Sequence, residues 1–406
     1  MIVGMFSAEA GFRILPITLL AIALTITACN DAPTDLGSDL VPGTDSLYAA
    51  SSLQQELFDS VFTASMREPA FNGTYVLFGR TADAEARMFV EFIDYPSFGP
   101  ADSFSVVQAD LMMIPQAYLY GDTASRTLSM TGYELQKLWS PTATWDSIWA
   151  QDGSSTYYSA AQKPICTVSK DLTATDSIVS VPLDPAAAKS WLVKGPDSLL
   201  RKELFGLVFV PTGGSSIRLY RAFNNAASVM RLRVATKRLG RDTIDTTFIE
   251  AAIAGFVNAP SPSPGALLVQ GAQVYRTQFD VDLSTIPQNA VIMSATLRVT
   301  VDTAASTSGN GPRDEVLRLS YSPAGSLSPI NLSVRGDDAT KTFRFGNLAS
   351  LVQDMMRNGR KGTLRIGPDG ANELWRMNRV PLFPMTADTA RRPKLSIIYS
   401  TPSVIK

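Results

Sequence analysis

The sequence predicts a mostly β protein built from two tandem antiparallel β-sandwiches, each with one short helix. Apolar and polar residues alternate over 275–283 and again over 294–302, and this period of two is typical of half-buried strands. Two strands with one apolar face each have to cover that face against another sheet, which predicts a sandwich. The chain has 406 residues, 45% of them hydrophobic, and is long enough to bury more than one core.

Residues 1–28 are expected to be a lipoprotein signal peptide. Arg13 precedes an apolar run at 14–27, which is shorter than the roughly 20 residues of a membrane-spanning helix. The run ends in Ile-Thr-Ala-Cys, which resembles the lipobox that signal peptidase II cleaves before a cysteine. Cys29 is therefore the expected lipidation site, where palmitate or similar acyl chains would anchor the protein to a membrane. The alternative is an ordinary secretory signal followed by an incidental cysteine.

Residues 29–52 are expected to form a flexible acidic tether, because they are rich in Asp, Pro, Gly, Ser and Thr. Asn30 and Asp31 after the cysteine resemble a signal for sorting to the outer membrane. The expected location is the cell envelope, at the outer membrane; exposure on the cell surface is left open. Once Cys29 is lipidated only Cys166 remains, so no internal disulfide is expected and stability must come from the size of the core.

An internal repeat divides the folded part into a first module at 53–238 and a second module at 243–402. Each module opens with a short strand bracketed by glycines and closes with an alternating strand. The linker 239–242 is short, which favours modules held at a limited range of angles.

The expected elements correspond in order between the two modules. In the first, Asp184 is a suitable helix N-cap with Pro185 behind it; in the second, apolar residues follow helical spacing over 348–356. The matching strands are expected at 73–79 and 265–271, 88–92 and 275–283, 108–114 and 294–301, 206–210 and 362–366, and 230–234 and 395–399.

Several of these segments resemble the DNRLRE domain family. Residues 275–287 and 294–299 are similar to the family's "FDLS.IP" and "SA.LRL" runs, and 392–399 is similar to its closing strand. In the first module, 139–145 and 189–196 resemble a Trp-containing loop and a helix end of the family, but the FDLS run is absent. The resemblance implies jelly-roll-like sandwiches in extracellular bacterial and archaeal proteins, often beside polysaccharide-degrading domains and in some members acting as carbohydrate-binding modules.

Composition excludes several classes of function. The 36 Lys and Arg against 37 Asp and Glu leave a net charge of -1, without the basic footprint of a nucleic-acid-binding protein. The chain has no His, which removes Ser-His and Cys-His pairs and imidazole-based metal sites. No catalytic residue, metal or cofactor is predicted. The carboxylates of Asp102, Asp110, Asp280 and Asp282 lie on or beside expected strands, without a looped calcium motif, and are interpreted as solvated.

Aromatic residues supply the candidate ligand-binding residues, because flat rings stack on sugar rings. We expect packing for Trp139 and Trp145. The candidates for contact with a ligand are Trp149, Tyr157, Tyr158 and, in a polar run of the second module, Trp375. Burial in a core is the alternative for each of these rings.

Three functions from different classes remain open. The first is a non-catalytic envelope lipoprotein that binds or organises extracellular glycan. The second is a structural, adhesion or complex-assembly lipoprotein whose partner is an outer-membrane protein. The third is a carboxylate-dependent polysaccharide hydrolase or lyase. The two expected sandwiches fill the chain and leave no segment for a separate catalytic domain. In all three the membrane is reached through the lipid anchor and no nucleic acid is bound.

Overall fold

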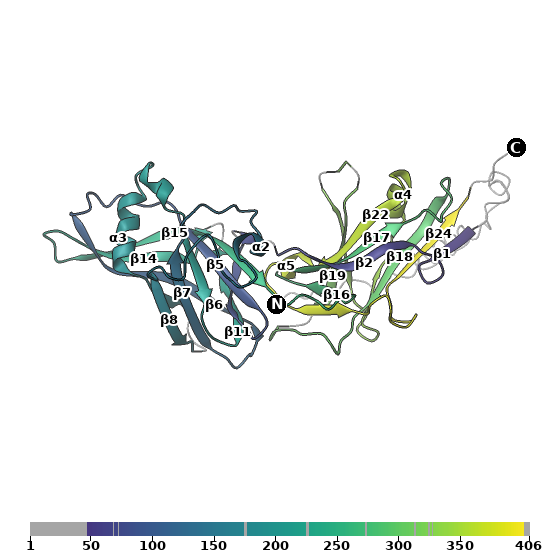
Figure 1. The fold of residues 1–406 in the computed structure, drawn as a ribbon, viewed down its shortest axis with the longest axis horizontal. Helices are drawn as coiled ribbons and strands as arrows, with labels where there is room; N and C mark the ends of the chain where they lie inside the picture. The colour runs from purple at the N-terminus through teal and green to yellow at the C-terminus, as the bar shows by residue number, and fades with distance from the viewer. Residues whose placement is uncertain are drawn as a thin grey trace, which may run out of the picture.

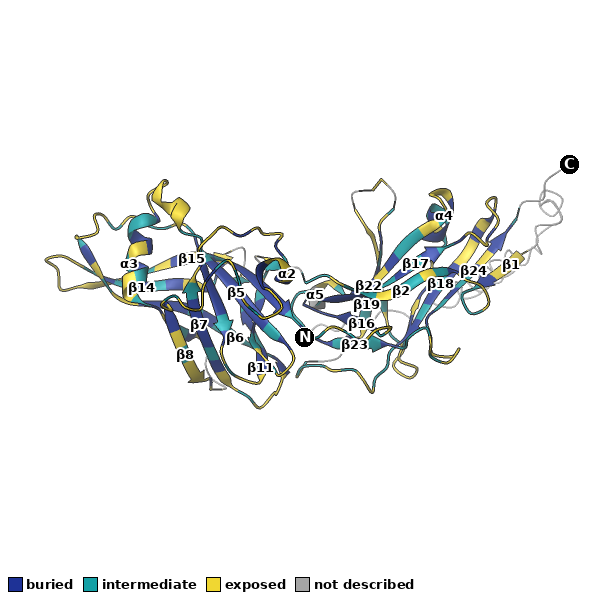
Figure 2. Cartoon of the chain, in the orientation of Figure 1, coloured by how far each residue is buried: buried dark blue, intermediate teal, exposed yellow. Residues whose placement is uncertain are grey.

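The structure is a computed structural model that describes residues 47–401, apart from 68, 72, 174–176, 225–226, 273, 312–313, 324 and 327. The expected signal peptide, Cys29, most of the tether and residue 402 lie outside the described residues. The described chain is mostly β, and its antiparallel sheets form two sandwiches that lie end to end (Figure 1). Apolar side chains form the core of each sandwich, and the strands of both carry many buried residues (Figure 2). None of the described helices combines the length and apolar character needed to cross a membrane.

The second sandwich contains the alternating stretch 275–302 and has two facing sheets. One sheet has the strand order β1-β24-β18-β21, and the other has the order β20-β19-β22-β17-β16-β23, with β2 also paired to β17. Phe279 of β17 and Leu297 of β18 are fully buried in one shared core. The strands are β1 (Leu47–Ser51), β2 (Phe58–Ser65), β16 (Leu267–Gln270), β17 (Tyr275–Asp282), β18 (Val291–Thr300), β19 (Val316–Tyr321), β20 (Ile330–Arg335), β21 (Thr342–Phe345), β22 (Lys361–Pro368), β23 (Arg379–Leu382) and β24 (Lys394–Ser400).

The first sandwich is one continuous sheet that folds over and closes on itself. Its order is β3-β15-β14-β6-β11-β4-β5-β10-β7-β8, with β9 on β6, and β15 closes the sheet because it pairs with both β14 and β5. A separate hairpin joins β12 to β13. The strands are β3 (Ala70–Phe71), β4 (Tyr75–Arg80), β5 (Glu85–Phe92), β6 (Phe104–Gly121), β7 (Thr127–Glu134), β8 (Cys166–Asp171), β9 (Val179–Pro182), β10 (Leu207–Pro211), β11 (Ser216–Arg221), β12 (Phe223–Asn224), β13 (Ala227–Ser228), β14 (Arg231–Arg238) and β15 (Ile244–Asn258).

Both predicted helices are present. The α3 helix (Pro185–Lys194) begins as expected, with the Asp184 carboxylate accepting a hydrogen bond from the Ala186 N–H at 2.9 Å. The α4 helix (Ala349–Arg357) packs its buried residues, among them Val352 and Met355, on the core of the second sandwich. The remaining helical segments are α2 (Trp145–Ile148), α5 (Gly370–Glu373) and the 3-10 turn η2 (Leu200–Glu203).

Strand pairing corrects the expected boundaries at residues 52, 53, 238 and 243. Strands β1 and β2, which were expected in the tether and the first module, pair with β24 and β17 of the second sandwich. Strand β15, expected to open the second module, belongs to the first sandwich. The expected linker 239–242 is the turn between β14 and β15, in which Gly240 has a φ of 75°. Alternation identifies a strand, but it does not say which sheet the strand joins.

The two sandwiches meet across a buried apolar cluster at their junction. Tyr120 and Leu219 of the first sandwich contribute to this cluster together with Leu268 and Tyr275 of the second. The chain also crosses the junction twice, between β2 and β3 and between β15 and β16. A buried cluster and two crossings hold the sandwiches at a defined angle more firmly than a single linker would.

Candidate functional site

The predicted aromatic segment of the first sandwich is packed against its sheet. The α2 helix places Trp145 and Trp149 one turn apart, with their ring centroids 4.4 Å from each other. The two rings are 4% and 2% exposed, and Trp149 also contacts Phe89 and Phe256. Trp139 is buried beside them. Packing was expected for Trp139 and Trp145, and it holds for Trp149 as well, because no ring face is left for a sugar.

The two neighbouring tyrosines do not complete a platform. Tyr158 is buried and stacks on Tyr133, with ring centroids 5.4 Å apart. Tyr157 is half-buried, and the Lys137 ammonium lies 4.1 Å from its ring centroid. Of the three candidates in this segment, Tyr157 alone keeps part of its ring in solvent.

A polar cavity of about 970 Å³ lies beside Trp149, at the end of the first sandwich that faces the junction. Its charged walls are largely paired within the protein: Arg67 lies 2.7 Å from Asp146, and Arg87 lies 2.7 Å from Glu85. The Arg87 guanidinium also covers the Trp149 ring at 5.0 Å. These walls can hydrogen-bond to a polar ligand, but they offer it no exposed aromatic face.

Trp375, the fourth candidate, lies in a groove of about 410 Å³ between the two sandwiches. Its ring and that of Tyr75 are both half-buried, with centroids 4.9 Å apart and planes at 75°. The Gln116 side chain and the Arg376 side chain also line the groove. The structure therefore brings Trp375 together with residues of the other sandwich, and places it apart from Trp149, Tyr157 and Tyr158.

The groove is built on a clamp between the sandwiches. The Tyr118 hydroxyl accepts a hydrogen bond from the Met377 N–H at 2.8 Å, which positions the segment that carries Trp375. The Asn310 side chain accepts from the Leu119 N–H at 2.8 Å and donates to the Ala117 carbonyl at 2.6 Å. Burial raises the pKa of the Tyr118 phenol, so it stays protonated. Hydrogen bonds to main-chain atoms of both sandwiches thus fix the positions of the groove walls.

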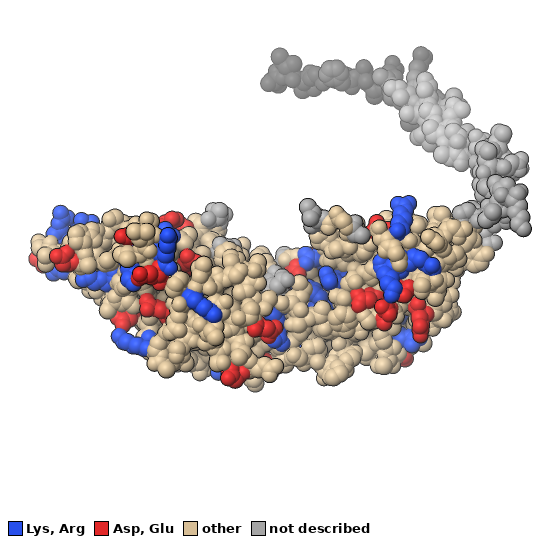
Figure 3. Space-filling model, turned by 45° about the horizontal axis from the view of Figure 1, so that its top comes forward, with Lys and Arg blue, Asp and Glu red and all other residues tan. Residues whose placement is uncertain are grey.

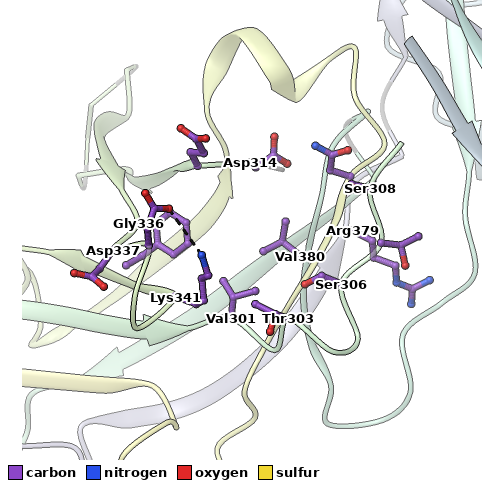
Figure 4. A pocket seen from close by; sticks show the side chains of 15 residues that line it. Val301, Thr303, Ser306, Ser308, Asp314, Gly336, Asp337, Lys341, Arg379 and Val380 are labelled. Atoms are coloured by element: carbon purple, nitrogen blue, oxygen red, sulfur yellow. Dashed lines mark ion pairs between the residues drawn. The ribbon is translucent and has the colours of Figure 1, made fainter. Parts of the chain in front are cut away.

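A smaller pocket of about 80 Å³ lies within the second sandwich (Figure 4). Asp314 on its wall is 7% exposed, and burial raises the pKa of this carboxyl to about 6, against the opposing effects of Asn378 and Arg376. Lys341 and Asp338, which both line the pocket, form an ion pair at 3.9 Å (Figure 4). Burial thus keeps Asp314 protonated up to a pH of about 6, well above the ordinary range of an aspartate.

The carboxylates singled out in the sequence are scattered over the first and second sandwiches. On the face shown in Figure 3, acidic and basic residues are likewise mixed over both sandwiches. Asp110 was interpreted as solvated; it is instead 3% exposed and lies 2.7 Å from the Arg233 guanidinium. Asp280 and Asp282 accept hydrogen bonds from neighbouring side chains and main chain. Among the described residues, no three potential ligands converge in a way that could hold a metal ion.

Some residues of the groove and the junction carried no signal in the sequence. Tyr75 is an ordinary strand residue by pattern, and its pairing with Trp375 depends on how the sandwiches meet. Arg276 alternates with apolar residues and was expected on a solvated face; it is 4% exposed and ion-paired with Glu373. Interactions of this kind join residues that lie about 100 or more positions apart in the sequence, and local patterns do not encode such pairs.

Comparisons with known proteins leave the family of this chain open. No protein-family model matches it, and no curated protein matches it. Among solved structures, the chain is similar to one from "Structure of the Macrobrachium rosenbergii Nodavirus", at 9% identity over 88% of this chain and 90% of that chain, with a TM-score of 0.12. A TM-score this low carries no argument about fold or function. Membership of the DNRLRE family remains a proposal from sequence segments alone.

Proposed function

We propose that this chain is a non-catalytic lipoprotein of the bacterial cell envelope that binds extracellular glycan in the groove between its two sandwiches. The observation that carries the proposal is the pair of half-exposed rings, Trp375 and Tyr75, in a groove of about 410 Å³. The other aromatic candidates are too buried, or too isolated, to offer a comparable surface.

The chemistry of the groove suits a sugar. The two rings stand at 75° to each other, so a pyranose that stacks on one of them also meets the edge of the other. Gln116 and Arg376 on the groove wall carry side chains that can hydrogen-bond to sugar hydroxyls. Two rings give an affinity in the micromolar to millimolar range. Dense display of the protein on a membrane would add avidity.

Binding without cleavage is the simpler use of this groove. Glycoside hydrolysis needs two carboxyl groups on opposite sides of the scissile bond. The described residues that line the groove include no Asp or Glu, which favours binding over cleavage at this place.

The experiment is calorimetry of the chain 30–406, which keeps every described residue, against a panel of neutral and acidic polysaccharides. For a glycan that binds, we expect Trp375→Ala to weaken binding by roughly tenfold, because stacking on one ring is lost. Tyr157→Ala is the matched control, since it removes a half-buried aromatic ring outside the groove. Unchanged affinity in Trp375→Ala and Tyr75→Ala would refute the groove as the site.

The anchor is tested separately. We expect Cys29→Ala to lose incorporation of radioactive palmitate in cells, and undiminished label would remove the lipoprotein part of the proposal.

A structural or complex-assembly role is the second candidate. The two chain crossings and the buried junction cluster favour it, because they make a stiff elongated body that can hold a partner at a set distance from a membrane (Figure 1). Failure of the whole glycan panel would leave this role.

A further inference from the structure

The outer face of the β1-β24-β18-β21 sheet is divided into an apolar end and a basic end. Strand register places the outward-facing residues in rows across the sheet. Leu47, Ile398 and Val291 lie in the rows at one end, Ser and Thr residues follow, and Lys394, Arg298 and Arg344 form a row toward the other end. Ile398 lies four positions after Lys394 on β24, which is about 14 Å along a strand.

The apolar end is unusually exposed for the surface of a soluble domain. Leu47 is 67% exposed, Met293 58%, Val291 46% and Ile398 44%. These residues come from the neighbouring strands β1, β24 and β18 and so form one patch. Figure 2 shows these strands toward the free end of the second sandwich, with β1 coloured as exposed. Scattered apolar residues are common on protein surfaces, whereas a contiguous patch marks an interaction site.

The basic row is costly for the sheet by itself. Arg298 lies directly opposite both Lys394 and Arg344 on its two neighbouring strands, and like charges in this position destabilise a sheet. Among the described residues, no carboxylate lies within 4.0 Å of the Lys394 ammonium or the Arg344 guanidinium. Arg298 is held in place by the main-chain carbonyl of Ala390 at 2.7 Å. An external anion would relieve the repulsion.

A hollow of about 500 Å³ lies over this row. Arg298, Arg344, Arg391 and the hydroxyls of Thr300 and Thr342 line it. Its acidic residue, Asp337, accepts three hydrogen bonds from its own turn, all on Oδ1. Arg391 is ion-paired with Asp388 at 2.6 Å, and the Thr300 and Thr342 hydroxyls lie 3.3 Å from each other. The hollow therefore presents chiefly the guanidinium groups of Arg298 and Arg344, which can bind phosphate oxygens.

The position of this sheet along the chain indicates what lies against it. Its edge strand β1 begins at Leu47, which follows Cys29 by 18 residues. Even a fully extended segment of that length spans at most about 60 Å. If Cys29 is acylated, the sheet with the exposed apolar patch is the one tethered directly to the membrane, within this distance.

We propose that the outer face of the β1-β24-β18-β21 sheet docks on a lipid surface that carries anionic headgroups. The apolar patch of Leu47, Val291, Met293 and Ile398 enters the boundary between headgroups and acyl chains. The row of Lys394, Arg298 and Arg344, about 14 Å away along the strands, meets lipid phosphates. This docking is independent of glycan binding and adds a second membrane contact to the Cys29 anchor.

The experiment uses the unacylated chain 30–406, so that binding does not depend on the anchor. Its sedimentation with phosphatidylcholine vesicles is compared with that on vesicles of phosphatidylcholine and phosphatidylglycerol in equal parts. We expect binding to the anionic vesicles, weakened by salt. The double variant Arg344→Gln/Lys394→Gln should bind about 30-fold more weakly, and Met293→Ser/Ile398→Ser at least about tenfold more weakly.

Two controls separate docking from general charge and stability. Lys170→Gln/Arg241→Gln removes two exposed cations of the first sandwich and should bind vesicles like the parent chain. The basic-row double variant should unfold at the same or a higher temperature than the parent, because it relieves the like-charge row. Loss of vesicle binding in a variant that is no less stable supports docking. Equal binding by both charge variants, or self-association through the patch without vesicle binding, would overturn it.

Discussion

Asp314 is the residue whose chemistry most clearly couples stability to pH. Its pKa is raised by burial to about 6 from the ordinary 3.8. The folded chain therefore holds this proton more tightly than the unfolded chain does. As pH rises from 3.8 through about 6, the free energy of unfolding falls, and it stays lowered at higher pH. A difference of this size corresponds to at most about 3 kcal/mol.

Asp314→Asn should abolish this pH dependence, because an amide has no proton to lose. We expect the variant to be more stable than the parent by about 1–3 kcal/mol at a pH well above 6, and of equal stability below pH 3.8. Urea unfolding at the two pH values measures the difference. Asp388→Asn is the control, since Arg391 lowers the pKa of that exposed carboxyl and no gain is expected. A gain of equal size at both pH values would contradict the assignment.

At the scale of residues, the sequence identified the candidate aromatic residues but did not predict which ring faces stay exposed to solvent. Trp149 was a candidate ligand contact because flat rings stack on sugars, yet one helical turn places its ring against Trp145, with the Arg87 guanidinium over it. Trp375 is partly open because two sandwiches meet beside it. Exposure depends on tertiary neighbours, and a single sequence does not list them.

At the scale of elements, the N-terminal strands complete the second sandwich. Strand β2 pairs with β17 along most of its length, and β1 covers the edge strand β24. Leu57, between them, is fully buried in the core of the second sandwich. Removing 47–65 would expose two strand edges and open a cavity at the site of Leu57, which by itself costs about 2–5 kcal/mol.

The fragment 243–402 should therefore not fold into a stable sandwich. A chain in which 47–65 is joined through a flexible linker to 260–401 should fold, because it restores the partners of β17 and β24. Circular dichroism during heating distinguishes the two, with a cooperative transition expected for the joined chain alone. The same joined chain with the order of 47–65 scrambled serves as the control. Cooperative unfolding of 243–402 by itself would refute the role of these strands.

Local sequence patterns predicted several of the elements, but they did not predict which sandwich each strand joins. The period of two identified β17, β18 and β24, and the N-cap at Asp184 identified α3. Strand β15 lacks this period over 251–257, where it is apolar on both faces, and such a strand can join either sandwich. The turn at Gly240 was interpreted as a linker because a hairpin and a short linker share the same residue types.

At the scale of the molecule, the two sandwiches are joined by close main-chain contact. The Asn310 N–H donates to the Leu119 carbonyl across the junction at 2.9 Å. Beside it, Gly309 lies so close that a Cβ atom there would be 2.2 Å from the same carbonyl oxygen and 2.9 Å from the Tyr118 ring. The nearest atom, the Leu119 carbonyl oxygen, belongs to the main chain and cannot move aside as a flexible side chain could. Glycine at this place therefore permits the sandwiches to touch.

Gly309→Ala should act as a wedge that weakens the junction without entering either core. We expect the parent chain 30–406 to unfold in one calorimetric transition, because the buried junction cluster couples the sandwiches. In Gly309→Ala the sandwiches should separate, and the single transition should split into two. The second sandwich, which carries Trp375, should unfold at the lower temperature. Gly346→Ala is the matched control, since a Cβ there meets nothing within 4 Å. One unchanged transition in Gly309→Ala would mean that the sandwiches unfold together for another reason.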